Sequence, residues 1–249
     1  MLQSMPMVHD LNEQADDLTS EIIHSFPQIT GVCLYGSVAR GDAGPDSDLD
    51  LLVVGLDPTL TPSSIKRRLR LKDVKPRVSI VYHTPRTLDR YAMTGSRFLL
   101  HVQLEGKVLY DQDGFLGRLK DRPLSKQSAA AEVDGQLKRL ALYDDASRYN
   151  GNFLFPLSHI YAIGKAIVMA ILAENEIYEF NRDRAFDAFS TLFPESLNDV
   201  ATVARLRPFY SMVSKGQDVE LPFAYHDCEQ EVRRATDAVR RLAEHLQRD

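Results

Sequence analysis

The first half of the chain alternates short apolar runs with amphipathic stretches. Apolar residues recur every three or four positions from Val8 to Ile22, which predicts an opening helix that ends before Pro27. Short apolar runs predict four strands, at residues 29–35, 49–54, 78–83 and 107–110. Two further helices are expected at residues 62–72 and 88–104. This order predicts a small sheet flanked by helices.

The second half of the chain shows helical spacing alone. Isoleucines at positions 160, 163, 167 and 171 fall on one helix face, and Val133, Leu137 and Leu140 fall on the face of another. Further helices are expected at residues 182–193, 196–213 and 228–247. We therefore expect an α+β protein with two domains: residues 1–122 hold the sheet, and residues 123–249 form an all-α helical bundle.

The most apolar segment, residues 153–173, has the length of a membrane span. Pro156, His159 and Lys165 interrupt it, and a lysine at the centre of a bilayer is costly. We interpret the segment as the central helix of the bundle and expect no membrane partner.

The N-terminus has no signal-peptide pattern, and Cys33 and Cys228 lie far apart, which favours a cytoplasmic location.

The charge of the chain is unevenly distributed. The net charge is −5, but residues 1–60 hold ten acidic side chains and one basic one, whereas residues 61–77 hold seven basic side chains and one acidic one. The basic stretch could attract a nucleoside triphosphate or an RNA backbone. A solvated helix face whose Ile65 and Leu69 pack inward is the favoured interpretation, because the whole chain is acidic and no RNA-binding motif accompanies the stretch.

The segment from Leu34 to Val54 carries the chemistry. Gly36 permits a close backbone approach at the end of a strand, and Ser37 offers a hydroxyl and an N–H to phosphate at a helix start. Asp48 and Asp50 are two positions apart at the next strand, so both project from the same face. Two carboxylates near a phosphate cradle form an oxygen-rich site for a hard cation such as Mg²⁺. The alternative is turn chemistry, since Asp-x-Asp pairs are common in turns.

The residues GSVARGDAGPDSDLDLLV resemble the signature of the DNA polymerase β-like nucleotidyltransferase superfamily, in particular its minimal nucleotidyltransferases. The resemblance implies a small mixed sheet, an NTP held at its phosphates by Gly36 and Ser37, and Mg²⁺ (or Mn²⁺) bound by Asp48 and Asp50. Arg40 matches a position that is often basic in the family, which implies a role in nucleotide binding. Helical domains of related enzymes often direct a lysine at the triphosphate, and Lys165 is the candidate here.

The chain departs from this family at one position. A third carboxylate usually lies on the following strand, and the alignment of residues 77–83 puts Ser79 there. A serine is neutral and a poor base, so three explanations are open: another acid replaces it, one metal ion suffices, or the protein binds nucleotide without turnover. Glu105, Asp73 and acids of the bundle are candidate replacements.

Two other groups of residues are weaker candidates. Arg240 and His245 have the R-x4-H spacing of HEPN ribonucleases, a match that is expected by chance in a chain with many arginines and seven histidines. Aromatic residues gather near the first loop of the bundle, where packing is a simpler explanation than base stacking. These residues are Tyr143, Tyr149, Phe153, Phe155 and Tyr161.

The sequence therefore predicts a Mg²⁺-dependent nucleotidyltransferase that moves a nucleoside monophosphate from an NTP to an acceptor hydroxyl. The acceptor could belong to a small molecule, a tRNA or a protein, and a homodimer or an operon-encoded partner is left open. The alternative is a degenerate, NTP-binding regulatory or interaction module of a toxin–antitoxin or defence system, which Ser79 favours.

Overall fold

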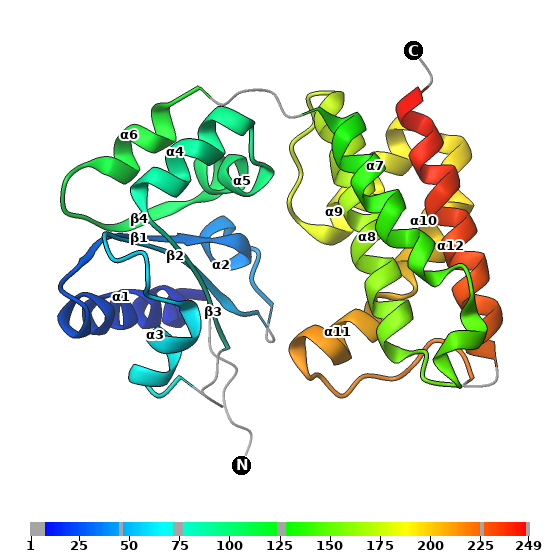
Figure 1. Ribbon diagram of the computed structural model, residues 1–249, viewed down its shortest axis with the longest axis horizontal. Coiled ribbons are helices and arrows are strands. Elements are labelled where there is room, and N and C mark those ends of the chain that lie inside the picture. The colour runs from blue at the N-terminus through cyan, green and yellow to red at the C-terminus, as the bar shows by residue number, and fades with distance from the viewer. Residues whose placement is uncertain (1–7, 45–46, 72–76, 124–127, 225–226, 248–249) are drawn as a thin grey trace. The chain divides into compact units, whose positions relative to one another are not determined.

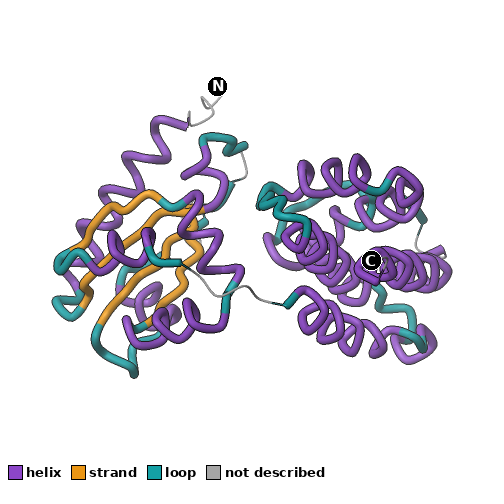
Figure 2. Tube along the Cα trace, turned by 90° about the horizontal axis from the view of Figure 1, so that it is seen from above, coloured by secondary structure: helices purple, strands orange, loops and turns teal. Residues whose placement is uncertain are grey.

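The chain folds into two compact units, residues 1–127 and 128–249. The structure, a computed structural model, describes residues 8–44, 47–71, 77–123, 128–224 and 227–247. Within these residues every strand belongs to the first unit, and the second unit consists of helices and loops (Figure 2). This arrangement is the α+β architecture expected from the sequence, a small mixed sheet followed by an all-α part. The sequence placed the domain boundary at residue 122.

The first unit is built on a four-stranded sheet with the strand order β3-β2-β1-β4. Its strands are β1 (Ile29–Tyr35), β2 (Leu49–Gly55), β3 (Val78–His83) and β4 (Lys107–Asp111). β1 is antiparallel to both β2 and β4, whereas β2 and β3 are parallel. The parallel pair matters for function, because it places the first residues of β2 and β3 side by side at one end of the sheet.

Helices cover both faces of this sheet (Figure 1). One face packs against α1 (Val8–Ser25), α2 (Gly36–Arg40) and α3 (Pro62–Arg68). The other packs against α4 (Pro85–Thr94), α5 (Arg97–Glu105) and α6 (Phe115–Asp121). Strand residues alternate between the two apolar clusters; Leu51 and Val53 face the first and Leu52 and Val54 the second.

The second unit is organised around α8 (Leu154–Glu174), whose apolar residues are buried among the surrounding helices. The other α-helices are α7 (Ala129–Leu140), α9 (Arg182–Leu192), α10 (Leu197–Ala204), α11 (Arg207–Lys215) and α12 (Cys228–Glu244). Short 3₁₀ turns are η1 (Ala141–Tyr143), η2 (Ala146–Tyr149), η3 (Pro194–Ser196) and η5 (His245–Gln247). Among the described helices only α8 has the length and composition of a membrane span, and most of its apolar window is buried inside the protein.

Two helices expected from the sequence are each divided in the structure. The stretch 88–104 belongs to α4 and α5, because Gly95 adopts a left-handed conformation (φ 72°) that ends α4. The stretch 196–213 belongs to α10 and α11, and Pro208 lies in the first turn of α11, where the missing N–H costs nothing. Apolar periodicity continues across both breaks, which is why spacing alone did not detect them.

The end of α3 is a Schellman motif that contains an arginine where glycine is the usual residue. The Leu71 N–H donates to the Lys66 carbonyl (2.9 Å), and Arg70 between them has a φ of 54°. Arg70→Gly is expected to raise the free energy of unfolding by about 1 kcal/mol, because glycine adopts this conformation without steric penalty. Urea denaturation would measure the change. As a control, Arg68→Gly within the helix should lower stability by about 1 kcal/mol, and a destabilised Arg70→Gly would contradict the prediction.

Candidate functional site

Asp50 is the second residue of β2 and Asp48 directly precedes the strand, next to the beginning of the parallel partner strand. Asp50 is opposite Tyr35 of β1 on one side and Ser79 of β3 on the other. Strand alternation puts Asp50 on the same sheet face as Leu52, the face covered by α4, α5 and α6. Both carboxylates are half-buried. The two acids therefore lie two positions apart at one end of the sheet.

Gly36 brings the backbone into close contact with one of these carboxylates. Its φ is +77°, a conformation that favours glycine, and a Cβ at this position would lie 2.5 Å from Oδ2 of Asp50. Glycine is thus required here for two independent reasons, the backbone conformation and the space that Asp50 occupies. The first turn of α2 and the carboxylate at the start of β2 form one local structure.

Ser37 helps to shape the loop between α2 and β2. Its hydroxyl donates to the hydroxyl oxygen of Ser47 at 3.1 Å, and that oxygen also accepts the Gly44 N–H at 2.9 Å. These bonds connect Ser37, the residue after Gly36, to Gly44 and Ser47 on the chain that leads to Asp50. Asp46, which the signature includes, lies outside the described residues.

Arg40 is engaged with two acidic side chains of the first unit. Its guanidinium donates to Glu105 Oε2 at 2.6 Å and to Asp42 Oδ1 at 3.1 Å. His101 Nε2 contacts the same Glu105 oxygen at 2.7 Å. Burial disfavours the charged form of Glu105, but the hydrogen bonds with His101 and Arg40 outweigh it and lower the pKa of the carboxyl. Arg40 therefore links α2 to α5, and its expected role in nucleotide binding stays a prediction.

Ser79 lies where the sequence alignment placed it, directly beside Asp50. Its side chain is hydrogen-bonded to the Tyr35 hydroxyl. Burial, and next the negative charge of Asp50, raise the pKa of Tyr35, so this hydroxyl stays neutral. The Tyr35 ring packs edge-on against Phe98 and His101, at centroid distances of 5.5 and 5.3 Å. The position next to Asp50 is thus occupied by hydroxyl groups.

Of the replacement acids suggested by the sequence, Glu105 is described in the first unit and is already engaged there. Glu105 is committed to Arg40 and His101, and Asp73 lies outside the described residues. Within the described part of the chain, no group of three His, Cys, Asp or Glu side chains is arranged to hold a metal ion. The two carboxylates at β2 are hard oxygen donors that suit Mg²⁺ or Mn²⁺.

Lys165 belongs to a cationic cluster inside the second unit. Its Nζ lies 5.5 Å from the centroid of the Tyr210 ring, and the Arg182 guanidinium lies 5.6 Å from the same centroid. Burial, and next the positive charge of Arg182, lower the pKa of Lys165 to about 8. The Tyr161 hydroxyl, whose ring packs on Tyr210, is buried without a hydrogen-bond partner in the described structure. Among the described residues these donors have no acceptor, and buried donors without an acceptor are what an anion site requires.

The sequence singled out Lys165 but not the residues around it. Arg182 begins α9 and Tyr210 lies in α11, so helix packing brings them to Lys165 across long sequence separations. Tyr161 was interpreted as a packing residue, and its ring does pack on Phe186. No local signal in the sequence connects these four positions. Among the described residues neither Lys165 nor Arg182 forms an ion pair.

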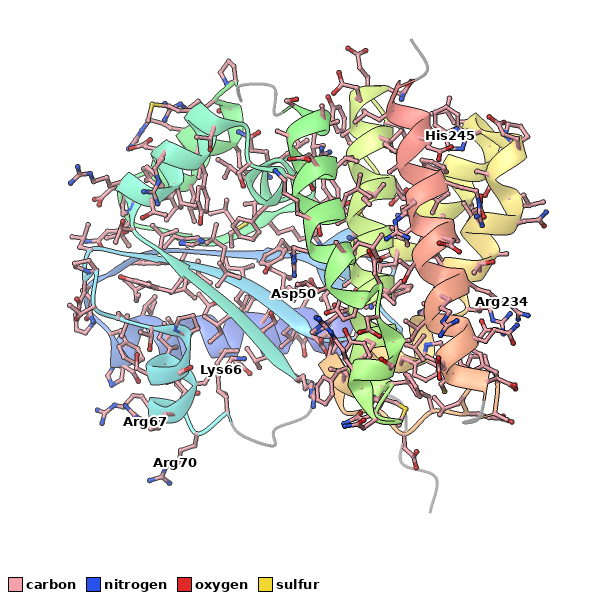
Figure 3. The ribbon with its side chains drawn as sticks, turned by 45° about the vertical axis from the view of Figure 1, so that its right-hand side comes forward. Asp50, Lys66, Arg67, Arg70, Arg234 and His245 are labelled. Carbon is pink, nitrogen blue, oxygen red and sulfur yellow. The ribbon has the colours of Figure 1, made fainter. Side chains whose placement is uncertain are left out.

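Arg67, Arg68 and Arg70 of the basic stretch are exposed at the end of α3, while Lys72 and Lys75 lie outside the described residues. Arg67 and Arg70 point away from the ribbon (Figure 3), while Ile65 and Leu69 on the opposite side of the helix are buried against the sheet. In the described part of the chain Lys66, Arg67, Arg68 and Arg70 form no ion pairs. The expected solvated helix face is therefore present, and basic side chains in a last turn also favour the helix dipole.

Arg240 and His245, the R-x4-H pair, each contact other residues of the second unit. Arg240 forms ion pairs with Asp144 and with Asp237 (3.3 Å). His245 is only 8% exposed and packs against the rings of Phe189 and Phe193. The two side chains have separate partners, so the geometry gives no support to a ribonuclease site.

Comparison with known proteins agrees with the geometry of the first unit. Residues 17–94 match the model of the family described as "Nucleotidyltransferase domain", a range that includes Gly36, both carboxylates and Ser79. No curated protein sequence matches the chain.

Two solved structures resemble the chain at low sequence identity. Spectinomycin adenyltransferase AAD(9) from Enterococcus faecialis, solved with ATP and spectinomycin, is 15% identical, with a TM-score of 0.54 over 92% of this chain and 99% of that chain. A toxin–antitoxin structure with AMP-PNP is 21% identical, with a TM-score of 0.33 over 52% of this chain and 96% of that chain. At this identity the first likeness shows a shared fold. The family match shows a nucleotidyltransferase domain within residues 17–94, in agreement with the resemblance seen in the sequence.

Proposed function

We propose that the protein transfers a nucleoside monophosphate from an NTP, in a Mg²⁺-dependent reaction, to an acceptor hydroxyl. The acceptor oxygen forms a bond to the α-phosphorus, the bond from that phosphorus to the oxygen bridging to the β-phosphate breaks, and pyrophosphate leaves. The acceptor proton is lost to solvent. The observation that carries the proposal is the contact between Gly36 and the Asp50 carboxylate, with Asp48 two positions before Asp50.

Each residue of this site has a role that its chemistry supports. Asp48 and Asp50 would hold Mg²⁺, which supplies charge neutralisation for the triphosphate when bound. Gly36 and Ser37 would bind phosphate oxygens through the backbone and the hydroxyl. Arg40, through its ion pair with Glu105, fixes α2 against α5 and so positions the phosphate-binding turn.

The cationic cluster of the second unit supports a further phosphate contact. We expect Lys165 to bind phosphate oxygens of the NTP, and Arg182 to contribute a second positive charge. Two cations and a buried hydroxyl without an acceptor are costly in the ligand-free protein, and a bound phosphate group would satisfy all three.

A labelled-NTP assay tests the proposed reaction. With Mg²⁺ or Mn²⁺, and with acceptor panels of small molecules, tRNA and protein, we expect label transfer with stoichiometric release of pyrophosphate. Asp48→Ala/Asp50→Ala should lower the rate at least about 10³-fold, because it removes both metal-binding carboxylates. Asp16→Ala/Asp17→Ala is the matched control: it changes the charge equally at exposed positions of α1. Unchanged transfer in the Asp48/Asp50 variant would refute the site assignment.

The same assay tests the alternative that Ser79 favours, an NTP-binding module without turnover. In that case NTP binds to the wild-type protein, yet no pyrophosphate is released with any acceptor. The neutral hydroxyl beside Asp50 is the observation behind this alternative. Binding by equilibrium dialysis and turnover by pyrophosphate release, measured on one preparation, distinguish the two functions.

The cysteines support a cytoplasmic setting for this reaction. Cys33 and Cys228 are both buried and free, so the structure does not depend on a disulfide. Burial raises the pKa of Cys33 to about 12, which keeps that thiol protonated and unreactive. A reducing compartment, where NTPs are abundant, is the location we propose.

A further inference from the structure

We infer that His101 and Glu105 of α5 are positioning residues of the nucleotide site, because together they hold both ends of α2, the short helix that begins with Gly36. The inference rests on the proposed function and adds to its site two residues that act through their neighbours. α2 has five residues, Gly36–Arg40, and a helix of this length is not stable by itself. Contacts with neighbouring elements therefore fix its place.

The first contact is between α5 and the residue that precedes α2. The helix α5 packs against α2 (Figure 1), and Phe98, His101 and Glu105 are spaced three and four positions apart on one side of it. The rings of Phe98 and His101 meet the Tyr35 ring edge-on, at centroid distances of 5.5 and 5.3 Å. Tyr35 is buried and is the N-cap residue of α2. Aromatic packing thus holds the start of α2.

The second contact joins the same side of α5 to the last residue of α2. Arg40 donates to Glu105 Oε2 at 2.6 Å, and each of these side chains is only 13% exposed. His101 Nε2 lies 2.7 Å from the same oxygen. His101 therefore takes part in both contacts: its ring packs on Tyr35, and its Nε2 holds the carboxylate that binds Arg40. A partly buried ion pair is costly to break on one side, so this end of α2 is also held.

The place of α2 determines the contact between the phosphate-binding turn and the carboxylate of β2. A Cβ on Gly36 would lie 2.5 Å from Oδ2 of Asp50, so a small displacement of α2 changes the distance between the two groups. The Tyr35 hydroxyl is also hydrogen-bonded to Ser79, the neighbour of Asp50 in the sheet. A displacement of about 1 Å costs on the order of 10²-fold in rate. Residues that fix α2 should therefore affect nucleotide binding and turnover.

Substitutions at the two positions test the inference in the full-length protein. His101→Leu removes both the ring and the hydrogen bond to Glu105, and we expect it to raise the KM for NTP and lower kcat, each by about 3- to 10-fold. His101→Gln, whose amide can reach Glu105, should recover part of this loss. Glu105→Gln leaves Arg40 with Asp42 as its remaining printed charge partner and should lower kcat/KM about 10- to 100-fold. Pyrophosphate release under steady-state conditions gives both constants.

Gln103→Leu is the matched control on the other side of α5. The Gln103 amide donates to the Leu119 and Arg122 carbonyls, at 2.7 and 2.8 Å, and so ties α5 to α6 and not to α2. Its replacement should lower stability in urea denaturation, as His101→Leu does, and leave kcat and KM unchanged. A change in kinetics that is specific to His101 and Glu105 is a result that loss of stability alone does not produce.

The sign of the change in NTP affinity distinguishes positioning from a direct phosphate contact by Arg40. If Glu105 only kept Arg40 away from phosphate, Glu105→Gln would free the guanidinium and lower the Kd for a non-hydrolysable NTP analogue, measured by equilibrium dialysis. Positioning predicts a raised Kd.

Two results would overturn the inference and leave the proposed function standing: a lowered or unchanged Kd in Glu105→Gln, or kinetics of His101→Leu that match those of Gln103→Leu. A wild-type protein that binds the analogue but releases no pyrophosphate would refute the transfer reaction alone, and the Kd values of the variants would still decide the inference. A wild-type protein that does not bind the analogue would overturn both.

Discussion

Gly36→Ala is expected to lower nucleotidyl transfer about 100-fold or more while leaving the protein folded. A methyl group at this position would lie 2.5 Å from Oδ2 of Asp50, so the carboxylate must move away from the first turn of α2. Displacement of a reacting or metal-binding group by about 1 Å costs on the order of 10²-fold in rate. The left-handed backbone at Gly36 (φ +77°) adds a loss of roughly 1–2 kcal/mol in stability.

Gly41→Ala separates these two effects. Gly41 also has a positive φ, +82°, but a Cβ there meets no atom within 4 Å. Its alanine variant should lose about the same stability as Gly36→Ala and keep nearly all of the activity. Steady-state kinetics together with urea denaturation of both variants would make the comparison. Equal activity in the two variants would contradict a specific role for the contact between Gly36 and Asp50.

The sequence was sufficient for those parts of the site that local periodicity determines. Two carboxylates two positions apart at the start of an apolar strand are predicted to share a face, and the structure has Asp50 in β2 and Asp48 directly before it. Ser79 was located by aligning a short apolar run, and the register places it beside Asp50. Both inferences needed only the strand positions and the alternation of side chains along them.

Local periodicity does not predict contacts between segments that are far apart in the sequence. Arg40 and Glu105 are 65 positions apart, and nothing in the local pattern of either indicates the 2.6 Å ion pair that joins them. Glu105 remained a candidate third acid from the sequence because its partners were unknown. In the same way, the approach of Arg182 to Lys165 depends on how α9 packs on α8, which apolar spacing does not specify.

Lys165 provides the other test with a large expected effect, because its charge costs stability in the ligand-free protein. Burial and the nearby Arg182 lower its pKa to about 8, below the usual 10.5. Between pH 8 and 10.5 the unfolded chain therefore binds a proton that the folded protein does not, and this group makes stability rise with pH in that window. Below pH 8 the charged form reduces stability by up to about 3 kcal/mol.

Lys165→Met should accordingly raise the free energy of unfolding by about 1–3 kcal/mol at pH 7, and the difference from wild type should vanish as the pH approaches 10.5.

The same substitution should raise the KM for NTP about 10- to 100-fold, because it removes a charge-assisted contact with phosphate. Lys138→Met is the control, since Lys138 is exposed and paired with Asp134 at 2.6 Å, and its loss should change stability by less than about 0.5 kcal/mol. A residue that only supports packing would lose stability when replaced and leave KM unchanged. Opposite signs in stability and NTP affinity would therefore identify Lys165 as a phosphate-binding residue, whereas an unchanged KM would remove it from the site.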